Sequence, residues 1–182
     1  MTPAIRKPKL KPSLRCTVVV LDEGWTEALP NAERLARRAA RAAFAGARRS
    51  GRRSLNVALD DDKGVRALNA RDRKKDKPTN VLSYPSGERD FLGDMVLARQ
   101  TVWREAREQR KSAADHFTHL VVHGTLHLLG YDHETGEADA ERMEALERRI
   151  LAKLGIADPY ALDWQTVEKV RSRADKRNNR NK

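Results

Sequence analysis

The sequence contains a single cysteine and no long apolar segment. Because Cys16 is alone among 182 residues, no disulfide can form within the chain, and a disulfide-stapled scaffold is excluded. No apolar run approaches the ~18 residues that a membrane-spanning helix needs. The basic N-terminal stretch also lacks the apolar core of a secretory signal. We therefore expect a cytoplasmic protein with no membrane partner, in which Cys16 is a small buried side chain in a reducing compartment.

Basic residues gather in three segments and account for the net charge of +11. Residues 1–15 carry five basic residues and no acid, and residues 171–182 add a net charge of +5. Residues 34–53 carry eight arginines and no acid. This distribution favours a polyanionic partner, above all nucleic acid. Solvated basic tails and an arginine-rich genome composition would produce the same pattern, so charge alone does not decide.

Hydrophobic periodicity predicts one domain with four strands and four or five helices. The expected strands cover residues 14–21, 54–59, 79–84 and 93–98. The expected helices cover residues 31–47, 63–71, 99–110, 112–129 and 135–154, with Asn31, Asp61 or Asp62, and Ser112 as caps. Without an internal repeat or a second core, this order predicts an α+β fold with a mixed sheet of about four strands packed against helices. The domain is expected at 14–165, between a basic extension at 1–13 and a basic tail at 166–182.

All five histidines lie in one segment, HFTHLVVHGTLHLLGYDH, which runs from His116 to His133. His123 and His127 are four residues apart on an expected helix, so their side chains lie on one face. A glycine then ends the helix, and the chain can turn back to bring His133 to the same point. Three imidazoles on a helix and turn are typical of a catalytic zinc site, which keeps a fourth position for water. Nickel, copper and iron also bind imidazole.

The histidine spacing resembles the zinc signature of metzincin metalloproteases, with one difference. Those enzymes place a glutamate directly after the first histidine as the general base, and this chain has Gly124 there. A helical glycine costs ~1 kcal/mol relative to alanine, so we expect Gly124 to permit a close backbone approach. Peptide hydrolysis is disfavoured unless a base comes from elsewhere, although a metal could still activate water.

Four segments closely resemble the YbeY family of bacterial metal-dependent endoribonucleases. They are HGTLHLLGYDH at 123–133, LNARDRKKDKPTNVLSYP at 68–85, LGDMVLA at 92–98 and the MEALE, LGI and DPY run at 143–160. The resemblance implies an α+β fold with one Zn²⁺ per chain, although another divalent transition metal remains open. It also implies hydrolysis of single-stranded RNA, a role in maturing the 3′ end of small-subunit ribosomal RNA, and a role in ribosome quality control. The implied partners are the small ribosomal subunit and ribosome-associated proteins.

Carried over residue by residue, the resemblance assigns the metal ligands to His123, His127 and His133. It assigns the functional arginine to Arg73, which would hold the phosphate while activated water attacks it. An arginine fork suits this task because it binds two phosphate oxygens and opposes their developing charge. The chain departs from the family at Asp72, where relatives often have an aromatic residue, and at Asn80, where many have aspartate.

Several residues near the motifs have two open interpretations. His119 either supports the site or is a satisfied buried side chain, and Asp132 either orients a ligand or caps a turn. Met143, Leu146, Ile150 and Leu154 follow helical spacing and are expected in the core, while Glu141, Glu144 and Glu147 are expected on a solvated face.

Two other functions compete with the endoribonuclease. One is a zinc metalloprotease-like hydrolase, against which Gly124 counts. The other is a non-catalytic RNA-binding ribosome-assembly factor whose metal only stabilises the fold. It would bind RNA without cutting it.

Overall fold

A computed structural model describes residues 12–161 of the chain. These residues form one α+β domain with a four-stranded mixed sheet, as predicted. The strands are β1 (Ser13–Val20), β2 (Arg52–Asp60), β3 (Val81–Pro85) and β4 (Phe91–Ala98). The helices are α1 (Gly24–Ala28), α2 (Ala32–Gly46), α3 (Asp62–Arg73), α4 (Arg99–Glu108), α5 (Ala113–Leu128) and α6 (Glu137–Leu154). The basic tail and most of the basic extension expected at the two ends lie outside the described residues.

The sheet has the order β1-β2-β4-β3. β1 pairs parallel with β2, β2 pairs parallel with β4, and β3 returns antiparallel beside β4. Parallel neighbours need crossover connections, and the helices between these strands supply them. The hairpin between β3 and β4 depends on Gly93, whose φ is +132° and where a Cβ would lie 2.0 Å from the Tyr84 carbonyl oxygen.

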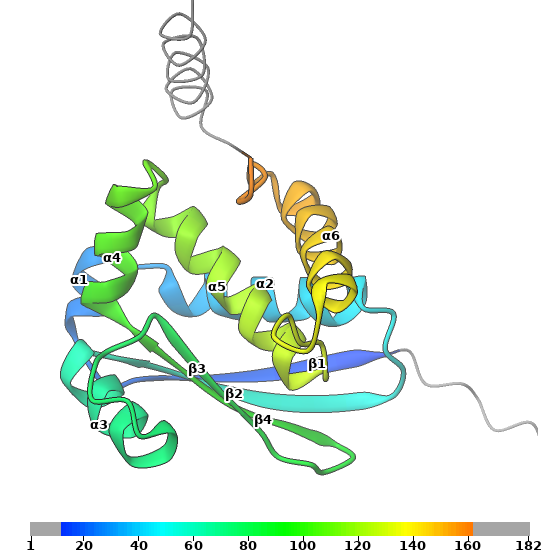
Figure 1. The fold of residues 1–182 in the computed structure, drawn as a ribbon, viewed down its shortest axis with the longest axis horizontal. Helices are drawn as coiled ribbons and strands as arrows, with labels where there is room; N and C mark the ends of the chain where they lie inside the picture. The colour runs from blue at the N-terminus through cyan, green and yellow to red at the C-terminus, as the bar shows by residue number, and fades with distance from the viewer. Residues whose placement is uncertain (1–11, 162–182) are drawn as a thin grey trace, which may run out of the picture.

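The main core lies between the sheet and a layer of helices. Leu55, Val57 and Leu59 alternate along β2 and are fully buried on the face that α2 and α5 cover. Small side chains on α2 (Ala36, Ala39, Ala40 and Ala43) are also fully buried, so this helix can pack closely. In Figure 1, α2, α4, α5 and α6 lie on one side of the sheet, and α3 lies on the other.

A smaller core lies between α3 and the opposite face of the sheet. It is formed by Val65, Leu82, Val96 and Ala98. Among the described helices, none is both long and apolar enough to cross a membrane.

The helix caps were predicted in part. The Asp61 side chain accepts a hydrogen bond from Gly64 N at 2.7 Å, and the Ser112 hydroxyl accepts one from Asp115 N at 3.0 Å. Asn31 does precede α2, but the prediction that its side chain caps the helix is wrong. Its φ of −106° and ψ of 15° lie outside the extended region from which an N-cap side chain reaches the first-turn N–H groups.

Candidate metal centre

The end of α5 brings three histidines together. His123 and His127 lie one turn apart on this helix, which ends in a Schellman motif around Gly130, with φ +86°. Gly130 N donates to the His127 carbonyl at 2.9 Å, and Tyr131 N donates to the Leu126 carbonyl at 3.0 Å. The chain therefore reverses directly after the helix and carries His133 back to the other two rings.

The three rings face one another closely. Their centroids are 4.6 Å apart for His123 and His127, and 5.1 Å apart for each of the other two pairs. One ring nitrogen from each histidine lies within 4.8 Å of the other two. His123 and His127 are partly buried, whereas His133 is exposed and leaves one side of the cluster open to solvent.

This nitrogen cluster fits a divalent metal ion. The Nε2 atoms of His123 and His127 are 3.1 Å apart. A tetrahedral zinc site with Zn–N bonds of about 2.05 Å places its ligand atoms about 3.4 Å from one another. A small adjustment of the rings would therefore accommodate an ion, and three neutral imidazoles are a donor set typical of catalytic zinc.

The histidines line an open cleft of about 710 Å³. One wall is formed by the cluster and the turn that follows α5, and it includes Tyr131 and Asp132. The other wall is formed by the end of α3 and by β3, and it includes Arg73, Lys75 and Ser83. The structure therefore places Arg73 in the same cleft as the three imidazoles, although the two motifs are fifty residues apart in the sequence.

Arg73 is the last residue of α3, and its guanidinium donates a weak hydrogen bond to the Ser83 carbonyl at 3.4 Å. The neighbouring Asp72 does not neutralise it. Asp72 accepts hydrogen bonds from Arg71 at 2.6 and 2.9 Å and from the Tyr84 hydroxyl at 2.9 Å. The Arg71 guanidinium holds the pKa of Asp72 below its usual value. Asp72 therefore forms its ion pair with Arg71. The positive charge of Arg73 is left available to a ligand in the cleft.

Asn80, the second departure from the family pattern, also lines the cleft. Its side-chain amide donates to Glu105 Oε2 at 3.0 Å, and the same oxygen lies 2.9 Å from His116 Nε2. Burial would raise the pKa of Glu105, but the hydrogen bonds from His116 and Asn80 hold it below its usual value. His116 is thus a buried histidine bound to a carboxylate, outside the candidate metal cluster.

Gly124, which replaces the protease glutamate, packs against the sheet. A Cβ at this position would lie 3.0 Å from Met95 Sδ and 3.1 Å from Ser83 Oγ. The Ser83 hydroxyl also donates to the Gly124 carbonyl at 3.4 Å. The expected close backbone approach is present, and a glutamate side chain at this position would require Met95 and Ser83 to move.

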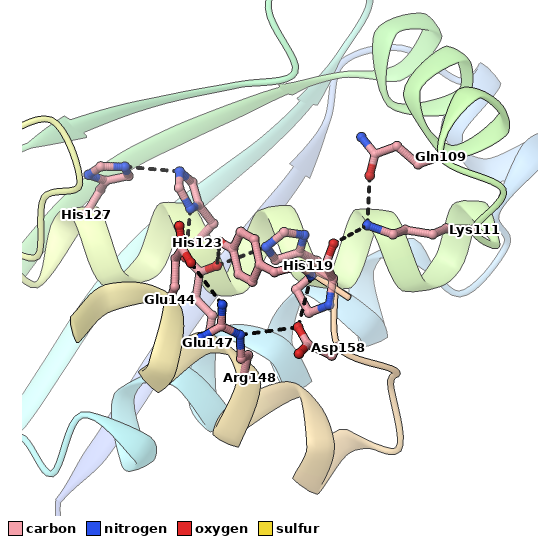
Figure 2. A network of polar contacts seen from close by, with 11 residues as sticks. Gln109, Lys111, His119, His123, His127, Glu144, Glu147, Arg148 and Asp158 are labelled. Carbon is pink, nitrogen blue, oxygen red and sulfur yellow. Dashed lines mark hydrogen bonds and ion pairs between the residues drawn. The ribbon is translucent and has the colours of Figure 1, made fainter. Parts of the chain in front are cut away.

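The prediction for Glu147 is wrong. This residue was expected on a solvated face of α6, but it is fully buried. Its carboxylate lies 2.8 Å from His123 Nδ1 and 3.0 Å from His119 Nε2 (Figure 2). It also accepts a hydrogen bond from the Tyr160 hydroxyl. Burial would raise the pKa of Glu147, but the hydrogen bonds from His119 and His123 hold it at about 2. An ionised carboxylate therefore lies directly behind the cluster.

His119 lies beside Glu147, and Asp132 lies in the turn that carries His133. His119 is mostly buried, and burial holds its pKa below the usual value. Its Nε2 faces Glu147, and its Nδ1 has no hydrogen-bond partner among the described residues. Asp132 Oδ1 accepts a hydrogen bond from Glu134 N at 2.9 Å, so Asp132 caps the turn that contains His133.

The fold and the site together define an α+β domain with a candidate catalytic metal centre on its central helix. Residues 22–155 match the family model described as "Endoribonuclease YbeY". The chain belongs to the YbeY family.

Two relatives of the same name support this membership. The protein from Azorhizobium caulinodans is 52% identical over 153 residues, which cover 80% of this chain and 95% of the relative. The protein from Novosphingobium aromaticivorans is 49% identical over 158 residues, which cover 79% and 94%. The match gives no support to the metalloprotease alternative.

A solved structure shares the fold. The solution structure of TM1509 from Thermotoga maritima aligns with a TM-score of 0.51 at 22% identity, covering 81% of this chain and all of the other.

Proposed function

We propose that this protein is a metal-dependent endoribonuclease that cuts unpaired RNA in the cleft between α5 and the α3–β3 wall. The observation that carries the proposal is the placement of three converging imidazoles and Arg73 in one open cleft. Membership in a family whose members are named endoribonucleases gives this geometry its reaction. The catalytic unit is the domain at 14–165.

His123, His127 and His133 would hold one divalent ion, and zinc suits this donor set best. Such an ion supplies activated water near neutral pH and offsets negative charge. Because His133 is exposed and all three histidines line the cleft, an ion held by them would be within reach of a substrate in the cleft.

The α3–β3 wall binds the phosphate. Arg73 offers a planar fork of N–H donors, which matches two oxygens of a phosphodiester. Lys75 adds a second positive charge on the same wall. As the phosphate gains charge during attack, the guanidinium of Arg73 would stabilise it more strongly than in the ground state.

Ribosomal RNA is the proposed substrate, at the 3′ end of the small-subunit RNA, and the small subunit and its proteins are the proposed partners. The protein would act in the cytoplasm, where it matures this RNA and takes part in ribosome quality control. The net charge of +11 supports binding to a large polyanion. The basic segments at 1–13 and 166–182 and the arginines of 34–53 would add salt-dependent affinity without sequence preference.

The test is cleavage of end-labelled RNA that has a duplex and an unpaired 3′ extension. The protein is compared as purified, after removal of metal by a chelator, and after addition of zinc. We expect cuts only in the unpaired extension, lost on removal of metal and restored by zinc. Binding without cleavage by the metal-loaded protein, on this RNA and on whole small subunits, would instead support the assembly-factor alternative.

A further inference from the structure

A hydrogen bond connects Glu147, on a second helix, to His123 of the candidate metal cluster. His123 belongs to α5, whereas Glu147 belongs to α6, twenty-four residues later. The side chain of Glu147 is fully buried. Its two carboxylate oxygens have different partners: Oε1 contacts His123, while Oε2 contacts His119 and the Tyr160 hydroxyl. In Figure 2, Glu147 and His127 lie on opposite sides of the His123 ring.

The chemistry of a carboxylate fixes where the hydrogens lie. An ionised carboxylate only accepts hydrogen bonds, so the ring nitrogen of His123 that faces it must carry the proton. That nitrogen is Nδ1. In a neutral imidazole the other nitrogen then has a free lone pair, and the Nε2 of His123 is the atom that faces His127. The arrangement aims a lone pair at the place where an ion would lie.

We propose that Glu147 is the positioning residue of the metal centre: it selects the Nδ1–H tautomer of His123 and fixes the orientation of its ring. The inference rests on the proposed metal site at His123, His127 and His133. Partners that orient a ligand in this way typically change metal affinity about 10–100-fold when they are replaced.

Other contacts hold Glu147 in this position. Tyr160 lies in the turn after α6, and the Arg148 guanidinium stacks over its ring, 5.0 Å from the centroid. Arg148 also pairs with Asp158 at 3.4 Å and with Glu144 at 3.0 Å (Figure 2). The turn that follows α6 is therefore clamped onto the helix, and its tyrosine keeps one carboxylate oxygen occupied. The other oxygen is left to His123.

A second ion between His119, His123 and Glu147 is a competing interpretation, because their ligand atoms also lie within 4.8 Å of one another. An ion there would have to displace the hydrogen bonds from His119 and Tyr160 from a fully buried carboxylate. It would also require His123 Nδ1 to lose the proton that it donates to Glu147. The positioning role keeps every one of these contacts and predicts one ion per chain.

The first test reads the tautomer in the metal-free wild-type protein. Long-range ¹H–¹⁵N NMR of the histidine rings is recorded above pH 7.5, with His123 assigned by comparison with His123→Asn. We expect His123 to be protonated at Nδ1 and unprotonated at Nε2. Protonation at Nε2 would overturn the proposal, and this result does not depend on the folding of Glu147→Gln.

The second test measures zinc affinity by competition with a chromophoric chelator. Glu147→Gln keeps the size of the side chain but can present an amide N–H to His123, so we expect about 10–100-fold weaker binding. Tyr160→Phe keeps the carboxylate and should weaken binding less. Glu141→Gln is the matched control, because Glu141 is exposed on the same helix, and it should bind as the wild type does.

The outcomes separate this inference from the proposed function. If His123→Asn binds zinc as tightly as the wild type, the metal site itself is wrong. If His123→Asn loses zinc while Glu147→Gln and Tyr160→Phe both retain wild-type affinity, the site stands and the positioning role is overturned. Two zinc ions per wild-type chain would favour the competing interpretation. If Glu147→Gln fails to fold by circular dichroism, Tyr160→Phe and the wild-type tautomer decide the question.

Discussion

The Nε2 atoms of His123 and His127 lie 3.1 Å apart on successive turns of α5. At this distance the two nitrogens can share one proton or direct both lone pairs at a cation, but they cannot both be protonated without repulsion. Burial and the neighbouring histidines hold the pKa of His127 below its usual value, which favours the neutral form that a metal requires. The helix therefore holds His123 and His127 in an arrangement that can bind a metal ion before any ion is present.

Metal removal should destabilise the protein. An ion present at a hundred times its dissociation constant stabilises the native state by about 2.7 kcal/mol. In a domain of this size, each kcal/mol changes Tm by about 2–4 °C. We expect a chelator to lower Tm by about 5–10 °C, as measured by differential scanning calorimetry, and zinc to restore it. In His133→Ala the chelator should have little effect, and an equal decrease in this variant would contradict the assignment of His133.

Replacing Arg73 should separate catalysis from folding. Arg73 is exposed and, within residues 12–161, its side chain donates one weak hydrogen bond, to the Ser83 carbonyl, so Arg73→Ala should leave Tm and zinc affinity unchanged. Loss of a charge that stabilises the phosphate should reduce RNA cleavage by about 10²–10³-fold. The matched control is Arg66→Ala, because Arg66 lies on the same helix and pairs with the exposed Asp76. Normal cleavage by Arg73→Ala would show that the phosphate is held elsewhere.

The fold followed from local patterns in the sequence. Alternation in β2 and the small-residue stripe of α2 are strong periodic signals, and both elements lie within a few residues of their expected bounds. The short helix α1 was missed, because five residues around the buried Trp25 carry no periodicity. The Asn31 cap failed because cap geometry depends on the backbone at one residue, which the turn before α2 decides.

The site was predictable where a motif is local and was missed where it depends on packing. The histidine spacing on α5 placed three rings together, because helical geometry and a terminal glycine determine their positions. Glu147 was missed although it fits the apolar stripe, four residues after Met143 and three before Ile150. An acid in a core stripe is a signal for a buried polar partner. That partner, His123, is identified only by the packing of α6 on α5.

Cys16 should make stability depend on pH above neutrality. Burial raises the pKa of its thiol from 9.0 to about 11, although Arg37 and Arg41 act in the opposite direction. The unfolded thiol loses its proton first, so the contribution to stability is complete below pH 9 and is lost as the pH rises toward 11. By pH 10 this loss is about 1.4 kcal/mol.

Urea denaturation at pH 8 and pH 10 checks this prediction. The free energy of unfolding should decrease more between the two pH values in the wild type than in Cys16→Ala. Because Lys111 and Tyr160 titrate in both proteins, their effects cancel in the difference. An equal decrease in the two proteins would show that the thiol has an ordinary pKa in the folded state.

Introducing the glutamate of the metzincin signature at position 124 should destabilise the fold rather than create a peptidase. In Gly124→Glu, the new Cβ would lie 3.0 Å from Met95 Sδ, and the rest of the side chain would be forced between α5 and the sheet. Overpacking and an unpaired buried carboxyl group should together cost at least about 2 kcal/mol. Gly124→Ala isolates the effect of the Cβ, and we expect a smaller loss of stability because alanine favours the helix by ~1 kcal/mol.

The measurements that check this prediction are Tm and cleavage of an unfolded protein substrate. A Gly124→Glu variant that melts like the wild type and cleaves peptide bonds would show that the α5–sheet contact is looser than 3.0 Å implies and that the metalloprotease alternative must be reopened.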